Sequence, residues 1–133
     1  MIIVVDQLSA PTNQALPEVQ WLLQAPGEPV VEGHSARASN GKSWLRCQTL
    51  LPVGSVPAAE RTSVNTHRVS ISHRGGGSLV MAHLITVGDG ALPGGVADAT
   101  ARVSTNGIEV RVSGNTFSFA RQRPYAVTAA DAD

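Results

Sequence analysis

Four histidines are the residues of this 133-residue chain best suited to bind a metal: His34, His67, His73 and His83. A zinc site needs three or four nitrogen, sulfur or oxygen ligands that converge on one point. His67 and His73 are an even number of residues apart, so they would share a face if one strand ran through both. His73 adjoins a glycine-rich turn, however, where we expect it to be exposed. We predict neither a metal site nor a cofactor.

Two further residues of reactive type are interpreted as parts of the core. His83 has the same parity as Leu79, Met81 and Ile85, so we predict a core histidine with one hydrogen-bonded ring nitrogen. Cys47, the only cysteine, lies in the apolar run WLRCQTLL and is interpreted as a small buried hydrophobe.

The sequence contains no recognisable catalytic set. The three glycines after Arg74 resemble a phosphate-binding loop, but such loops precede a helix and a strand is expected here. The carboxylates are scattered, no serine lies in a nucleophile elbow, and Tyr125 has no base beside it in the sequence. We predict no catalytic residue, so this chain alone is not expected to be an enzyme.

Trp21 and Trp44 are the candidate carbohydrate contacts, because flat indole rings stack on sugar faces. Both lie in apolar stretches, VQWLL and SWLRC, and packing in the core is the competing interpretation. The chain is only 4% aromatic, which is low for a carbohydrate-binding module.

Composition bounds the class of protein. A length of 133 residues predicts one domain, and a composition that is 42% hydrophobic and 15% charged predicts a folded rather than a disordered chain. Ten basic and ten acidic residues cancel, which favours neither nucleic acid nor a membrane surface as partner. No segment approaches the roughly 20 apolar residues of a membrane-spanning helix. The opening run is cut by Asp6 and lacks a basic region, so it is not a signal peptide.

The elements that position these residues are predicted to be short strands, because glycines and prolines separate short apolar segments without a helical period. The ten expected strands span residues 2–7, 19–24, 29–32, 35–39, 43–51, 68–73, 79–87, 97–104, 108–113 and 116–121. We therefore predict an all-β fold, an antiparallel β-sandwich of about ten short strands. A small closed barrel is the second choice.

Turn and alternation signals refine this prediction. Asn40-Gly41 and Asn106-Gly107 favour type I′ hairpin turns, and a third tight turn is expected at Gly114-Asn115. The segment 108–113 alternates between apolar and polar residues, with Ile108, Val110 and Val112 inward, and Phe117 and Phe119 continue that inward face. The segment 79–87 is apolar at both parities, which predicts a central strand covered on both faces.

Two segments fall outside the strand pattern. Residues 52–66 are predicted to form a long irregular connection, of the kind that is functional or flexible. Residues 124–133 are predicted to be a flexible acidic tail, which leaves residues 1–123 as a single domain.

Several short elements occur in a characteristic order: residues 3–6, residues 21–24, Asn40-Gly41 through Leu45 to residues 50–52, residues 84–87 with Pro93 after them, and residues 107–114 with Phe117. Together they resemble the C-terminal β-rich region of heparinase II/III-like polysaccharide lyases, which include alginate lyase relatives. The likeness covers most of residues 2–121. Gln24 stands where relatives often carry histidine, so no role of that imidazole is carried over.

The resemblance implies a non-catalytic C-terminal β-sandwich that supports an N-terminal catalytic toroid and helps to shape a cleft for an acidic polysaccharide such as a glycosaminoglycan or alginate. The parent enzyme would act by β-elimination, in which a base removes the proton α to a uronate carboxylate and the 4-O bond breaks. It would be periplasmic or secreted. The family's catalytic residues lie before the equivalent of Ile2, so none is carried onto this chain. An autonomous carbohydrate-binding or adhesion module, and a sandwich without a ligand, are the alternatives.

The chain begins directly with a strand-like apolar run. If earlier strands of a parent protein normally pair there, the run needs another cover, because open edges and apolar faces attract partners. We expect this cover to be the 53–64 segment or a second copy of the chain, in a homodimer through the edge from Ile2 to Gln7.

Overall fold

The computed structural model of the protein describes residues 1–64, 66–95 and 97–121. These residues form strands and turns but no helix, so they include no helix that could cross a membrane. The predicted all-β class is confirmed. The strands are β1 (Ile2–Ser9), β2 (Val19–Ala25), β3 (Val30–Glu32), β4 (Ser35–Ser39), β5 (Ser43–Leu51), β6 (Ala58–Ser63), β7 (Thr66–His73), β8 (Ser78–Asp89), β9 (Ala99–Ser104), β10 (Gly107–Val112) and β11 (Asn115–Ala120).

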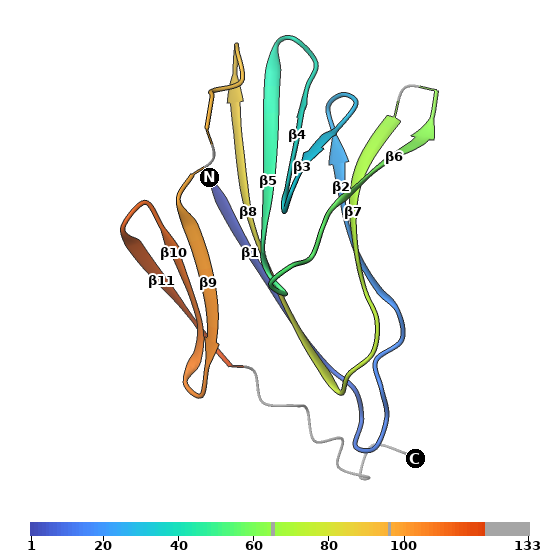
Figure 1. Cartoon of the computed structure of the whole chain (residues 1–133), viewed down its shortest axis with the longest axis vertical. Helices are drawn as coiled ribbons and strands as arrows, with labels where there is room; N and C mark the ends of the chain where they lie inside the picture. The colour runs from blue at the N-terminus through green and yellow to red at the C-terminus, as the bar shows by residue number, and fades with distance from the viewer. Residues whose placement is uncertain (65, 96, 122–133) are drawn as a thin grey trace, which may run out of the picture.

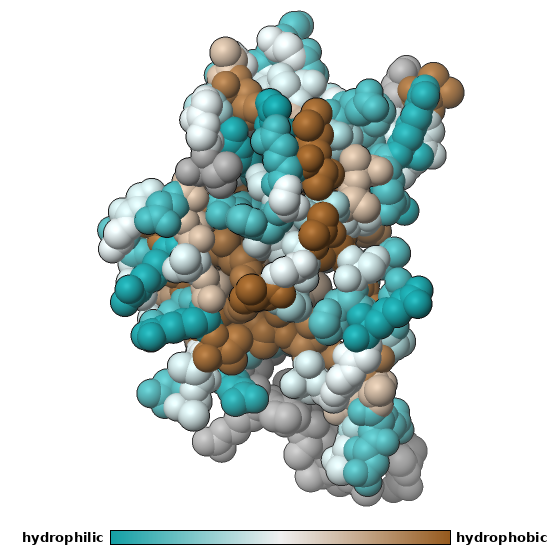
Figure 2. Space-filling model, viewed as in Figure 1, coloured by the Kyte–Doolittle hydropathy of each residue, from teal (hydrophilic) through white to brown (hydrophobic). Residues whose placement is uncertain are grey.

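The strands form three sheets in which all paired neighbours are antiparallel (Figure 1). A five-stranded sheet has the order β1-β8-β5-β4-β3. The sheet β11-β10-β9 lies on one side of it and the sheet β2-β7-β6 on the other. Figure 2 shows hydrophobic residues gathered in the middle of the visible face, with hydrophilic residues around them.

Strand β8 contributes side chains to the hydrophobic cores on both faces of the central sheet, as its two-sided apolar sequence predicted. Ala82 and Leu84 belong to a hydrophobic cluster with Ile108, Val110 and Val112 of β10. Side chains alternate along a strand, so His83 points to the opposite face. There its ring stacks on Trp21 of β2, with ring centroids 4.0 Å apart. The molecule is therefore a sandwich of three layers.

A β-bulge near the end of β5 adds a second leucine of that strand to the hydrophobic cluster that contains β10. Thr49 pairs with His83 and Leu51 with Ala82, so Leu50 is an extra residue in the ladder. As a result both Leu50 and Leu51 belong to the cluster that contains β10, although neighbouring strand residues normally face opposite ways.

The prediction of an irregular connection over residues 52–66 is wrong, because the segment contains strand β6, which pairs with β7. The strand is polar in sequence because it is an edge strand with an exposed outer face. Its Glu60 is bound there by Arg68, at 2.6 Å, and by the Ser70 hydroxyl. These hydrogen bonds lower the pKa of Glu60, the one from Ser70 most. Polar pairs of this kind leave no hydrophobic alternation to detect.

The two predicted Asn-Gly turns do not have type I′ geometry, which requires positive φ at both central residues. Outside glycine, only Asn13 and Ser113 have positive φ among the described residues. At Asn40 the side-chain oxygen instead accepts bonds from the backbone N–H groups of Lys42 and Ser43, at 3.0 and 2.9 Å. The type I′ pattern occurs at Ser113-Gly114, with φ of 48° and 83°, one residue before the predicted turn.

The apolar run of β1 is covered from within the chain. Ile3 and Val5 pack against the cluster that contains β10, on the same face as their register partners Leu84 and Ala82. The 53–64 segment does not provide this cover: its three valines remain 86%, 64% and 75% exposed (Val53, Val56 and Val64). The side chains of Ile3 and Val5 are thus covered by the sheet β11-β10-β9, and not by the 53–64 segment as expected.

Candidate functional site

The structure keeps the histidines apart. One strand, β7, runs through His67 and His73, and the two side chains face the same side of it. Both are half-buried, so the expectation that His73 is exposed is wrong. Six residues of strand separate them by about 20 Å, too far for one metal ion. No group of three or more histidine, cysteine or acidic side chains gathers within the described parts of the chain. Strand β8 begins at Ser78, so the Gly75–Gly77 run leads into a strand, as expected.

His83 is fully buried between the central sheet and β2. The prediction of one hydrogen-bonded ring nitrogen is wrong: within the described residues neither Nδ1 nor Nε2 has a partner. Its ring instead stacks on Trp21 with an interplanar angle of 23°. Burial lowers the pKa of His83 to about 4, so the imidazole is neutral near pH 7.

Cys47 is buried on β5, as predicted. Burial raises the pKa of its thiol to about 12, because the thiolate would lose its hydration. The thiolate is the reactive form of cysteine, so this side chain is an unreactive part of the core.

The two tryptophans have different surroundings. Trp21 is half-buried, with one ring face against His83. Trp44 is also half-buried and lies over its register partner Gly88, where an added Cβ would come within 2.6 Å of ring carbon Cζ2. Trp44 borders an open cavity of about 500 Å³ that includes Gln24, Ser43 and Asp89. Sugar contact by either ring stays a prediction.

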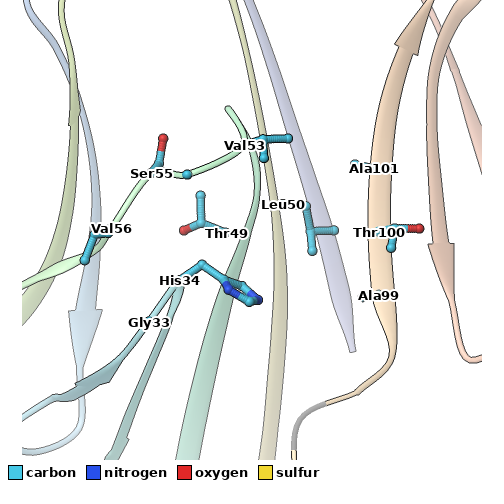
Figure 3. Close-up of a pocket in the computed structure, with 11 residues that line it drawn as sticks. Gly33, His34, Thr49, Leu50, Val53, Ser55, Val56, Ala99, Thr100 and Ala101 are labelled. Atoms are coloured by element: carbon cyan, nitrogen blue, oxygen red, sulfur yellow. The ribbon is translucent and has the colours of Figure 1, made fainter.

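One pocket lies between β9, the end of β5 and the segment that follows β5 (Figure 3). Its volume is about 370 Å³, within the range of small-ligand sites. Figure 3 shows Leu50 and Val53 pointing across it toward β9. Its lining residues are Gly33, His34, Thr49, Leu50, Val53, Gly54, Ser55, Val56, Ala99, Thr100 and Ala101.

Five of the eleven lining residues are aliphatic, and His34 is the one ionisable side chain among them. Thr49 is 4% exposed, and its hydroxyl has no hydrogen-bond partner within the described residues. In Figure 3 this hydroxyl points toward the Val56 side of the pocket. Sequence reasoning missed the site, because its residues come from four separate segments, and Ala99 and Ala101 carry no chemical signal of their own.

Some predictions lie outside the described residues, among them Tyr125 and the acidic tail over residues 124–133. Comparison with protein-family models, with curated proteins and with solved structures finds no match for this chain.

Proposed function

We propose that this chain is the non-catalytic C-terminal β-sandwich of a heparinase II/III-like polysaccharide lyase. In that role it supports a catalytic toroid and contributes to the wall of an acidic-polysaccharide cleft. The parent protein is proposed to be periplasmic or secreted, with the toroid as the chief partner of this domain.

The observation that carries the proposal is the position of the sequence elements behind the resemblance. Residues 3–6 and 84–87 belong to β1 and β8, which pair directly, with Ile3 opposite Leu84. The Leu50-Leu51 element ends β5, the other neighbour of β8. The 107–114 element includes β10, which packs on the same face. Four of the elements thus contribute to one core, while the 21–24 element lies in β2, on the other face of the central sheet.

The gene supplies the first test. We expect the codons upstream of Ile2 to encode, in the same reading frame or in a neighbouring gene, a helical toroid with a catalytic tyrosine and histidines. A genomic context without such a segment would contradict the proposal.

The second test is enzymatic. The purified chain is expected to form no unsaturated uronate from heparin, heparan sulfate or alginate, measured by ultraviolet absorbance, whereas the longer protein should form it. Product formation by the isolated chain would show that catalytic residues lie within it.

An autonomous carbohydrate-binding module is the second candidate, favoured by the surroundings of Trp44. The neighbouring cavity offers the amide of Gln24, the hydroxyl of Ser43 and the carboxylate of Asp89, all groups that bind sugar hydroxyls. A carboxylate repels a uronate, so this cavity suits a neutral sugar better than an acidic one.

Binding assays separate the two candidates. If the module binds sugar autonomously, neutral oligosaccharides should change the tryptophan fluorescence, and Trp44→Ala should remove saturable binding while Trp21→Phe keeps it. If the chain is only a supporting domain, neither variant should differ from the parent in a titration with neutral or acidic oligosaccharides.

A further inference from the structure

The pocket shown in Figure 3 touches the free edge of a sheet. Among the described residues β9 pairs only with β10, so its other side is unpaired. The pocket contacts three consecutive residues of β9: Ala99, Thr100 and Ala101. Consecutive side chains point to opposite faces, so a cavity over one face would contact every second residue. A run of three therefore places the pocket against the backbone edge.

The ladder indicates which backbone groups point into this space. The N–H of Ser113 donates to the carbonyl of Asp98 at 2.8 Å, which extends the β9–β10 ladder by one pair. Pairs alternate in an antiparallel ladder, so Thr100 faces β10 as Asp98 does. The N–H and C=O groups of Ala99 and Ala101 point the other way, toward the open edge.

The opposite wall of the pocket is aliphatic. Leu50 lines it as a buried residue, and Val53 and Val56 line it with 86% and 64% of their surfaces exposed. Ala99 and Ala101 are small, which leaves room for a branched side chain beside the strand edge. No acidic, lysine or arginine side chain is among the lining residues.

We propose that β9 and this pocket bind an extended, uncharged peptide segment of another protein, by strand addition. The peptide backbone pairs with Ala99 and Ala101, as in other complexes that extend a sheet at its edge. One branched aliphatic side chain of the peptide enters the pocket between Leu50 and the two valines. Because no acidic, lysine or arginine side chain lines the pocket, a charged side chain at that position would lack such a partner, and burying an unpaired charge is costly. This binding is independent of the proposed function.

The probe is an acetylated pentapeptide amide in which threonine alternates with isoleucine, followed by fluorescence anisotropy with the labelled peptide. We expect saturable binding, with backbone amide NMR shifts concentrated at Ala99, Thr100 and Ala101. Replacing the isoleucines by aspartate should abolish binding. Methylating alternate peptide nitrogens should also abolish it, because that removes the donors to β9 while keeping the side chains.

Matched variants of the protein complete the test. Val53→Lys with Val56→Lys should weaken binding by at least about tenfold, through loss of aliphatic contact. Val64→Lys is the control, since Val64 is 75% exposed on a different turn and should leave affinity unchanged. Circular dichroism should show all three proteins folded, because these valines are exposed.

Three results would overturn the proposal: no saturable binding, equal affinity for the N-methylated peptide, or equal affinity of the double-lysine variant and the control. If the parent chain forms a dimer, the double-lysine variant does not, and no peptide binds, the edge of β9 is assigned to a second copy of the chain instead.

Discussion

At pH 7 the His83 imidazole is neutral, because burial lowers its pKa to about 4 from a value of 6.5 in an unfolded chain. Between these values the unfolded chain binds the proton more strongly than the folded one. The free energy of unfolding is therefore highest above pH 6.5 and falls as the pH falls toward 4. The difference corresponds to about 3 kcal/mol.

His83→Leu should remove this pH dependence, measured by urea unfolding between pH 7.5 and 4. The substitution also removes two ring nitrogens without partners, so it should cost little at pH 7. His34→Gln, at an exposed histidine, is the control and should keep the dependence. Equal pH profiles for the two variants would contradict the assignment to His83.

The contact between Trp44 and Gly88 gives a second prediction at this scale. A Cβ at Gly88 would meet the indole ring at 2.6 Å, so Gly88→Ala must displace the ring. We expect a loss of about 1–3 kcal/mol and a shift of tryptophan fluorescence. Gly94→Ala is the control, because nothing lies within 4 Å of its added Cβ. An unchanged urea midpoint for Gly88→Ala would show that the ring is not held there.

Among the elements, the β10–β11 hairpin has a turn whose sequence is not optimal. Ser113 adopts φ of 48°, a region that asparagine tolerates better than serine. Ser113→Asn should therefore stabilise the domain by up to about 1 kcal/mol in urea unfolding. Gly114→Ala should destabilise it, since Gly114 has φ of 83°. If Ser113→Asn lowers the unfolding midpoint, the turn does not have this geometry.

At the scale of the whole molecule, Ile3 and Val5 join the central sheet to β10. Replacing both by lysine should destabilise the fold by at least about 2 kcal/mol, because charged groups would enter an apolar interface. Ile2→Lys is the matched control: Ile2 is 54% exposed and should change the stability little. A double variant as stable as the parent would show that the two layers are not joined by these residues.

Self-association is a separate prediction. β1 lies at one edge of the central sheet, and the homodimer predicted from the sequence would pair two copies through the edge from Ile2 to Gln7. The side chain of Gln7 already donates to the carbonyl of Ala120, at 3.0 Å. We expect sedimentation velocity to show a dimer that dissociates on dilution. A single monomeric species at every concentration would exclude this homodimer.

Much of the architecture was predictable from local pattern. The bounds predicted for the strand from Ser43 to Leu51 match those of β5, because a strong apolar run ends at proline. The two-sided apolar sequence of β8 predicted its central place, and the alternation in β10 predicted its buried face. Strand β6 was missed because its stabilising partners, Arg68 and Ser70, belong to another strand and leave no periodicity in its own sequence.

By itself the sequence determined the fold class, the central strand and the burial of Cys47 and His83, because each depends on the pattern of apolar residues within one short segment. Tertiary structure alone decided which residues come into contact: His83 lies on Trp21, Trp44 lies on Gly88, and Ala99 and Ala101 line the same pocket as Leu50. These neighbours come from segments far apart in the chain. Which segments meet depends on how the three sheets stack and on the bulge at Leu50. The free energy of this packing is shared among many residues, so no single residue carries a sequence signal that predicts it.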